Sequence, residues 1–276
     1  MLYICATPIG NLSDMTPRVI DTLREVDLIA AEDTRNSIKL LNHFDIKTPM
    51  TSYHEFNKYD KADELVAKMQ NGFDVAIITD AGTPAISDPG EVLVQKCHES
   101  GISVTSLPGA CACITALTLS GLSTRRFAFE AFLPSDKKER KDVLSELINE
   151  TRTIIIYEAP HHLLNTLKEL FEALGNRKIT LCKELTKKFE NINKTTLESA
   201  ITYYTENDPK GEFVLVIEGK SRDEIKKEKQ ASFEEMSIEE HMNLYLNQGI
   251  DKKEAMKLVA KDRGVSKRDI YNSLLN

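Results

Sequence analysis

The chain has 276 residues, with 36 lysines and arginines against 43 aspartates and glutamates, so its formal net charge is −7. Hydrophobic residues make up 41% and charged residues 29%, which is typical of a globular protein, and the length favours two domains, with or without a small appendage. The acidic balance excludes a basic field over the whole surface, although basic side chains gathered on one face can still bind nucleic acid.

The N-terminal residues and the cysteines indicate the cellular setting. MLYICATPIG has no basic region followed by a long apolar stretch, so no signal peptide is expected, and no window approaches the roughly 20 apolar residues of a membrane span. The five cysteines form no C-x-x-C pair, so we expect no structural zinc. Together these features predict a cytoplasmic protein without a membrane association or a bound metal.

In the first half of the chain, short apolar runs alternate with amphipathic segments. Strands are predicted at 2–6, 27–31, 75–79, 104–107 and 127–132. Helices are predicted between them at 17–26, 34–44, 61–71, 89–100 and 110–120. This alternation predicts an α/β fold with a largely parallel sheet that is covered by helices.

A second, shorter α/β round is predicted after a polar linker at 134–142. Helices are expected at 143–149, 162–174 and 197–204, and strands at 153–157, 178–183 and 212–218. We therefore expect two unequal α/β domains, 1–133 and 134–220, followed by a solvated charged segment at 221–230.

The tail at 237–276 shows apolar residues at helical spacing, in three pieces broken near Gly249 and Gly264. Residues 249–276 contain seven basic and four acidic side chains, and GVSKRDIYN after a helix is typical of a helix-turn-helix. Two interpretations stand side by side: a small helical cap with solvated lysines, or a contact with nucleic acid.

Several common cofactor motifs are absent from the sequence. The turn after the first strand is ATPIGNLSD rather than G-x-G-x-x-G, and the chain contains no G-x-x-x-x-G-K-[ST] loop and no H-E-x-x-H pair. A nicotinamide oxidoreductase, nucleotide triphosphate chemistry or a metal site is therefore not expected.

Three turns after predicted strands carry small and rigid residues instead. They are TPIGN at 7–11, TDAGTPAISDPG at 79–90 and LPGACAC at 107–113. Because ligands of an open parallel sheet bind outside the carboxyl ends of its strands, these turns should line one crevice. Glycine and proline also punctuate ordinary tight loops, but three such turns at one edge favour a site.

The second half contributes two strands that end in ionisable residues. IIIYEAPHH at 154–162 carries Glu158 and His161, and LCKELTKKFE at 181–190 carries Lys183, Glu184 and Lys187. These side chains suit either acid–base chemistry and anion binding or an ordinary surface ion-pair patch.

Taken in order, these motifs resemble one known family. The set comprises ATPIGNL, AEDTR, TDAGTPAISDPG, LPG, SGL, FLP, YEAPH and KELTK, between residues 6 and 187. It is similar to the rRNA small-subunit methyltransferase I family of the tetrapyrrole-methylase superfamily, from about residue 2 to 219 and again in the helical tail. The resemblance implies two unequal α/β domains with S-adenosylmethionine in the cleft between them, a homodimer and a C-terminal helical appendage.

The resemblance also implies a set of cofactor contacts. They are Pro8, Ile9, Gly82, Thr83, Pro84, Ile86, Cys111, Ala112, Glu158 and Leu185. The sequence departs from the family at two places: His162 replaces a usual arginine, and PGACA replaces PGPSA. The first departure puts one basic contact with RNA in doubt. The second changes little if the contact with the cofactor at this turn is made by the backbone.

The implied reaction is 2′-O-methylation of a cytidine ribose in the decoding region of 16S rRNA, within the 30S subunit. Candidates for the catalytic groups are Asp88, Glu184 and Lys187, with His54 and His161 as rivals. The phosphates of the RNA are expected to meet basic side chains of the linker, of the tail and of Arg125 and Arg126. The alternatives are a tetrapyrrole or protein methylase of the same superfamily, and a ribosome-binding protein without catalytic activity.

Overall fold

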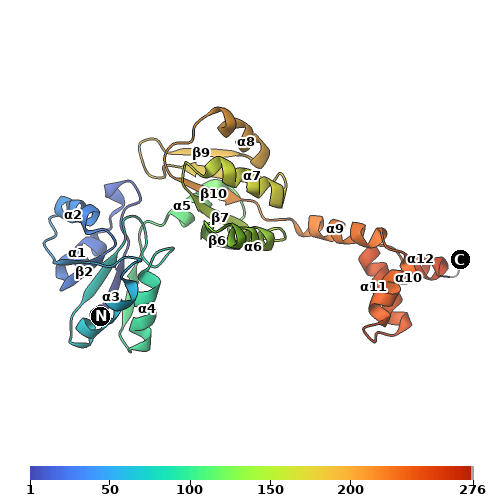
Figure 1. Ribbon diagram of the computed structural model, residues 1–276, viewed down its shortest axis with the longest axis horizontal. Coiled ribbons are helices and arrows are strands. Elements are labelled where there is room, and N and C mark those ends of the chain that lie inside the picture. The colour runs from blue at the N-terminus through green and yellow to red at the C-terminus, as the bar shows by residue number, and fades with distance from the viewer. Residues whose placement is uncertain (275–276) are drawn as a thin grey trace. The chain divides into compact units, whose positions relative to one another are not determined.

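The computed structural model describes residues 1–274, which divide into two compact units. The larger unit consists of Met1–Leu147 and Arg152–Glu218 and contains both β-sheets (Figure 1). The smaller unit consists of Ile148–Thr151 and the segment that starts at Gly219. Within the described residues, no helix is long and apolar enough to span a bilayer.

The first sheet has five parallel strands in the order β3-β2-β4-β1-β5, which confirms the predicted parallel sheet. Its strands are β1 Leu2–Cys5, β2 Leu28–Ala31, β3 Met50–Ser52, β4 Val75–Ile78 and β5 Val104–Leu107. The intervening helices are α1 Pro17–Glu25, α2 Thr34–His43, α3 Lys58–Gln70 and α4 Gly90–Glu99, with a short 3-10 turn η1 at Leu12–Asp14.

The continuous apolar strands are explained by burial on both faces. In β4, Val75 and Ile77 pack against α3 and α4, whereas Ala76 and Ile78 pack with α1 and α2. Because side chains alternate across a strand, a central strand such as β4 needs apolar residues at every position.

The second sheet is mixed and has the order β6-β7-β10-β8-β9. Its strands are β6 Phe127–Phe132, β7 Thr153–Glu158, β8 Lys178–Lys183, β9 Asn191–Thr196 and β10 Phe213–Ile217. Within the described part of this sheet, β6 and β7 pair in parallel and the other neighbouring strands pair antiparallel. Helices α6 Lys137–Leu147, α7 Leu163–Leu174 and α8 Leu197–Glu206 bury one face, and α5 Ala112–Ser120 buries the other.

The boundary between the two sheets lies earlier than the residue 134 expected from composition. β6 forms hydrogen bonds with β7, and α5 packs its Ala116 and Leu117 against the second sheet. The polar segment at 134–142 therefore lies inside the second α/β layer. It was expected to be a linker, but most of it forms α6, whose first turn is capped by Asp136 accepting from the backbone N–H groups of Lys138 and Glu139.

The charged segment at 221–230 is likewise helical. It forms most of α9, Arg222–Glu234, which begins with a capping box between Ser221 and Glu224. Lysine and glutamate are good helix formers, and the cap satisfies the first backbone N–H groups, so a helix forms with little apolar surface.

The tail forms three helices with breaks at the two predicted glycines. They are α10 Ile238–Leu246, α11 Lys252–Arg263 and α12 Lys267–Ser273. Met242, Ala255, Val259 and Ile270 form a small apolar core. The last two residues of the predicted tail segment lie outside the described residues.

Candidate functional site

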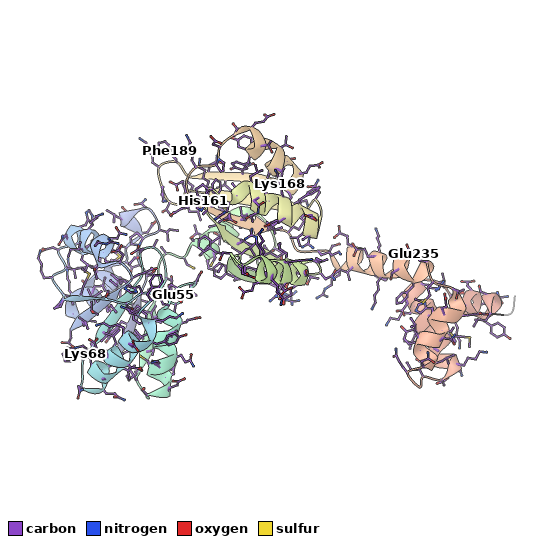
Figure 2. All side chains as sticks on the ribbon, in the orientation of Figure 1. Glu55, Lys68, His161, Lys168, Phe189 and Glu235 are labelled. Atoms are coloured by element: carbon purple, nitrogen blue, oxygen red, sulfur yellow. The ribbon has the colours of Figure 1, made fainter. Side chains whose placement is uncertain are left out.

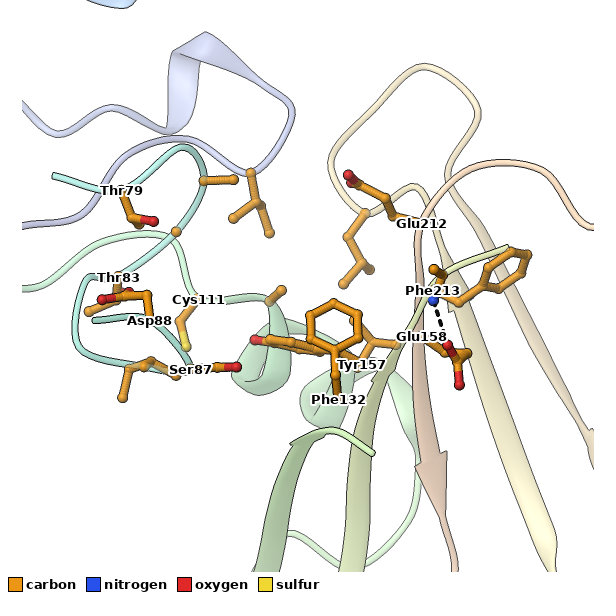
Figure 3. A pocket seen from close by; sticks show the side chains of 18 of the residues that line it. Thr79, Thr83, Ser87, Asp88, Cys111, Phe132, Tyr157, Glu158, Glu212 and Phe213 are labelled. Carbon is orange, nitrogen blue, oxygen red and sulfur yellow. Dashed lines mark hydrogen bonds between the residues drawn. The ribbon is translucent and has the colours of Figure 1, made fainter. Parts of the chain in front are cut away.

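The carboxyl ends of the first-sheet strands and one end of the second sheet line a cavity of about 480 Å³ (Figure 3). This size is within the range of small-molecule sites. The lining residues come from both sheets and are Ile9, Glu32, Thr79, Ala81, Gly82, Thr83, Ile86, Ser87, Asp88, Cys111, Ala112, Phe132, Tyr157, Glu158, Ala159, Pro160, Cys182, Leu185, Glu212, Phe213 and Val214.

Backbone hydrogen bonds join the first two predicted turns. The N–H of Thr7 donates to the carbonyl of Gly82 at 2.9 Å, and the N–H of Gly82 donates to the carbonyl of Thr7 at 3.1 Å. The Thr7 hydroxyl also donates to the carbonyl of Thr79 at 3.0 Å. Gly82 has φ +91°, a conformation that glycine adopts without strain, so the turn can fold back onto Thr7.

Asp88 holds the second turn in a strained conformation. Its Oδ1 accepts from the N–H of Ala85 at 2.9 Å and from the N–H of Gly90 at 2.7 Å. Ala85 and Ser87 both have positive φ, at 67° and 64°. Burial raises the pKa of Asp88, although these backbone donors oppose the effect. Strain of this kind persists only where surrounding contacts fix it, and it is common at functional sites.

Glu32 is a pocket residue that the sequence interpretation did not assign to the site. Its Oε2 accepts from the Thr79 hydroxyl and, at 3.3 Å, from the N–H of Asp80. The AEDTR motif that contains Glu32 was part of the family resemblance. Its position after β2, at the same sheet edge as the three turns, was a signal that could have placed it here.

The third turn brings two thiols to the start of α5. The Sγ atoms of Cys111 and Cys113 are 3.4 Å apart, and Cys111 is half-buried where it lines the pocket. The hydrogen bond with the Cys113 thiol, followed by backbone N–H groups at the helix start, lowers the pKa of Cys111. The same interaction and burial raise the pKa of Cys113. Cys111 is therefore the more nucleophilic of the two thiols.

Tyr157 forms an aromatic wall together with Phe132 and Phe129. The Tyr157 hydroxyl accepts from the N–H of Cys113 at 3.0 Å, and both phenylalanine rings meet the Tyr157 ring in edge contacts. Figure 3 shows Tyr157 and Phe132 beside the cavity. The sequence indicated neither aromatic residue as a site residue, although both lie in motifs of the resemblance.

The Glu158 carboxylate is held by its own domain. Oε1 accepts from the N–H of Ala159 at 2.8 Å, and Oε2 accepts from the hydroxyl of Thr166 in α7. Arg140 in turn donates to the Thr166 hydroxyl at 2.7 Å and to Glu169 at 2.6 Å. Arg140, one of the linker side chains expected to meet RNA, is therefore engaged inside the domain.

Glu184 and Lys187 form a network with Glu212. Lys187 Nζ lies 3.0 Å from Glu184 Oε1 and 2.8 Å from Glu212 Oε2. The Glu212 N–H, followed by the Lys187 ammonium, lowers the pKa of Glu184, and the two carboxylates raise the pKa of Lys187 against its desolvation. Glu184 is thus anionic and Lys187 cationic over a wide pH range.

The cavity brings together most of the predicted cofactor contacts. Those that line it are Ile9, Gly82, Thr83, Ile86, Cys111, Ala112, Glu158 and Leu185. Pro8 and Pro84 flank lining residues but do not line the cavity themselves. Of the candidate catalytic residues, Asp88 lines the cavity, whereas Glu184 and Lys187 do not; Lys187 is paired with Glu212, which does.

The charged side chains that line the cavity are all acidic among the described residues. Its ionisable carboxylates are Glu32, Asp88, Glu158 and Glu212. Among the described residues, no lysine or arginine lines it. A cationic ligand is therefore favoured over a phosphate-bearing one.

Comparison with known proteins gives three consistent results. Residues 1–201 match the model of the tetrapyrrole (corrin/porphyrin) methylases. The chain is 48% identical to ribosomal RNA small subunit methyltransferase I of Synechocystis sp., over 98% of this chain and 96% of that protein. It is 44% identical to the protein of the same name from Bacillus subtilis, over 99% and 93% of the two chains.

Solved structures support the fold at low sequence identity. Diphthine synthase matches with a TM-score of 0.60 and 12% identity, over 79% of this chain and 89% of that chain. Uroporphyrin-III-C-methyltransferase from Thermus thermophilus matches with a TM-score of 0.56 and 16% identity, over 78% and 93%. These two proteins share the arrangement of sheets and helices with the larger unit.

Proposed function

Because the chain belongs to the ribosomal RNA small subunit methyltransferase I family of the tetrapyrrole methylases, we propose that it methylates the 2′-hydroxyl of a cytidine ribose in 16S rRNA. The methyl donor is S-adenosylmethionine, and the substrate is the decoding region within the 30S subunit. On this proposal the protein acts in the cytoplasm as a homodimer, as the resemblance to the family implies.

The observation that carries this proposal is the acidic cavity at the sheet edges. Four carboxylates line it, no lysine or arginine of the described residues does, and its walls include Ile9, Leu185 and Phe213. S-adenosylmethionine combines a sulfonium cation with an apolar adenosine face, so these residues fit it. A dinucleotide cofactor would instead bring its pyrophosphate against the carboxylates, which is unfavourable.

Main-chain groups of the three turns would hold the methyl donor. Gly82 and Ala112 leave the backbone open to a ligand, and Cys111 and Tyr157 add a thiol and a phenol on one wall. From the second domain, Leu185 and the residues beside Glu158 would cover the adenosine. When it is bound, S-adenosylmethionine supplies a methyl group activated by the positive sulfur.

The chain's own contribution to the reaction is alignment and removal of a proton. Holding the ribose oxygen in line with the methyl group converts a bimolecular reaction into an effectively unimolecular one. We assign the general base to Asp88, because its raised pKa makes it a better proton acceptor than Glu184, whose pKa is lowered. Lys187 is assigned to the adjacent phosphate as a point charge.

The experiment that tests the substrate class compares two acceptors. Purified protein is incubated with S-adenosylmethionine carrying a tritiated methyl group and either 30S subunits without ribose methylation or uroporphyrinogen III. We expect label in 16S rRNA and none in the tetrapyrrole. Label only in the tetrapyrrole would contradict the RNA assignment and favour the rival suggested by the wider superfamily. Binding to 30S subunits without transfer would favour the non-catalytic alternative.

A further inference from the structure

A second cavity, of about 290 Å³, lies on the second α/β layer beside the C-terminal end of α8. Lys183 at the end of β8, Asn191 and Asn193 on β9, and Tyr203 on α8 line it. The connection after α8 adds Asp208 and Lys210. Nothing in the proposed handling of the methyl donor uses these side chains.

The two lysines are available for an anion. Among the hydrogen bonds and ion pairs of the described residues, none involves the ammonium group of Lys183 or Lys210. Lys183 is half-buried, so its charge loses part of its solvation within the protein. A phosphate bound between the two ammonium groups would restore that solvation.

The aromatic side of this cavity is rigid and open. Tyr203 is 53% exposed, and its ring meets the ring of Tyr204 edge-on at 5.0 Å. Tyr204 in turn meets Phe213 edge-on at 5.8 Å, which anchors the pair to the core of the sheet. An exposed ring held in this way is a platform for stacking a nucleobase.

The polar side chains of this cavity can form hydrogen bonds with the edge of a nucleobase. The amides of Asn191 and Asn193 offer both donors and acceptors, and the Asp208 carboxylate accepts hydrogen bonds from an exocyclic amino group. Charged, aromatic and amide groups thus line one small cavity. The charged groups suit a phosphate, the aromatic ring suits the face of a base, and the amides suit the edge of a base.

Strand register connects this cavity with the methyl-donor cavity. Phe213 on β10 is paired with Glu158 on one side and with Lys183 on the other, and Lys183 is paired with Asn191. Glu158 and Phe213 line the first cavity, whereas Lys183 and Asn191 line the second. With neighbouring strands about 5 Å apart, Lys183 lies about 10 Å from Glu158 along this row.

The loop that connects β8 to β9 carries two lysines, two glutamates and one phenylalanine. Residues 184–190 connect β8 to β9, and this loop contributes Leu185 to the first cavity. Its exposed end carries Lys188 close to the ring of Phe189, which is 71% exposed. Figure 2 labels Phe189 at the end of this loop. A single strand that crosses the loop would meet cationic and aromatic groups along the way.

We propose that the second cavity binds a nucleotide of the substrate RNA that flanks the target cytidine. Lys183 and Lys210 pair with its phosphate, Tyr203 stacks on its base, and Asn191 and Asn193 contact the base edge. This subsite rests on the proposed RNA methylation, and it fixes the register of the strand so that the target ribose reaches the first cavity.

The test uses methyl transfer to 30S subunits by the full-length protein at several KCl concentrations. For Lys183→Gln and Lys210→Gln we expect an increased KM for 30S subunits and an unchanged dissociation constant for S-adenosylmethionine. The dependence of log kcat/KM on log salt should become shallower by about 0.7 for each lysine removed. Tyr203→Ala should raise KM on the order of tenfold, whereas Tyr203→Phe, which keeps the ring, should behave as wild type.

The control is Lys168→Gln, which removes an exposed lysine of α7 outside the cavity (Figure 2). This variant should retain both the wild-type KM and the wild-type salt slope. If the wild type methylates 30S subunits while the cavity variants keep its KM and salt slope, the subsite is refuted and the proposed function stands. If the wild type transfers no methyl group to 30S subunits, both proposals fail together.

Discussion

At the scale of single residues, Asp88 has a structural role and a proposed catalytic role. Its Oδ1 accepts the hydrogen bonds that stabilise a turn in which Ala85 and Ser87 have positive φ, and its carboxyl group lines the cavity with a pKa raised by burial. A buried carboxylate is costly to ionise, which is the property that suits a proton acceptor. The structural role of Asp88 in the turn and its role as a proton acceptor can be separated by comparing two substitutions.

Asp88→Asn keeps an oxygen that accepts from Ala85 and Gly90 but cannot take a proton. We expect kcat to fall by about 10²–10⁴-fold, with little change in the affinity for S-adenosylmethionine. Asp88→Ala should reduce both kcat and the affinity for S-adenosylmethionine, because the turn loses the hydrogen bonds from the Ala85 and Gly90 N–H groups. In the wild type, kcat should decline as the pH falls through the raised pKa of Asp88. An Asp88→Asn variant with wild-type kcat would exclude this residue as the base.

Cys111 should be the most reactive cysteine of the folded protein. Its pKa is lowered by the Cys113 thiol, whereas the pKa values of Cys5, Cys97 and Cys182 are raised by burial. Iodoacetamide should form a thioether first at Cys111, with loss of iodide, and S-adenosylmethionine should slow this reaction.

Peptide mass spectrometry after a short exposure identifies the modified position. Cys111→Ser serves as the control and should abolish the fast phase. Equal modification rates with and without S-adenosylmethionine would contradict the placement of Cys111 in the donor cavity.

At the scale of elements, the first turn and the 184–190 loop meet closely. A Cβ added at Gly10 would lie 2.4 Å from Lys187 Cγ and 3.0 Å from the carbonyl oxygen of Leu185. Glycine at this position therefore lets the TPIGN turn approach the loop that contributes Leu185 to the cavity.

Gly10→Ala should displace this loop and weaken binding of S-adenosylmethionine on the order of tenfold, because the added carbon has no space. Isothermal titration calorimetry measures the effect. Gly175→Ala is the matched control: it also has positive φ, but an added Cβ has no neighbour within 4 Å, so only stability should decrease. Unchanged affinity in Gly10→Ala would show that the loop does not shape the donor site.

The sequence predicted the elements with strong apolar periodicity and missed those that depend on tertiary context. The buried strands β1, β2 and β4 are predicted within a residue, since their apolar runs reflect burial. β9 has little apolar content because it is an edge strand. The segment 134–142 was predicted as a linker because it is highly charged, but the Asp136 cap and the helix propensity of its residues make most of it the first half of α6.

The same limit applies to the candidate site. The three turns were identifiable because glycine and proline mark backbone that approaches a ligand. Glu212 and Phe213 looked like part of a closing core strand, and nothing in GEFVLVIEG distinguishes the end that faces the cavity. Their role follows from the pairing of β10 with β7 and β8, which depends on long-range register.

At the scale of the whole molecule, the helical appendage has its own core and its own titratable group. His241 is fully buried, its ring stacks on Phe233 at 4.0 Å, and its Nδ1 accepts from Arg263 at 3.2 Å. Burial, followed by the Arg263 charge, lowers the pKa of His241, although Asp262 opposes the shift.

The stability of the appendage should therefore depend on pH. A lowered pKa means that the unfolded state binds the proton more readily, so the contribution of His241 is fully present above about pH 6.5 and is lost as the pH falls through its folded pKa. Amide hydrogen exchange of α10 and α11 measures this. His43→Gln, which alters an exposed histidine, should leave the pH profile unchanged. A profile without any loss below pH 6 would contradict the argument.

The most direct test of the account locates the transferred methyl group. After reaction with tritiated S-adenosylmethionine, 16S rRNA from the 30S subunits is digested to nucleosides and separated. The account predicts that the label elutes as 2′-O-methylcytidine. Label on a base-methylated nucleoside, or in a ribose other than that of cytidine, would contradict it.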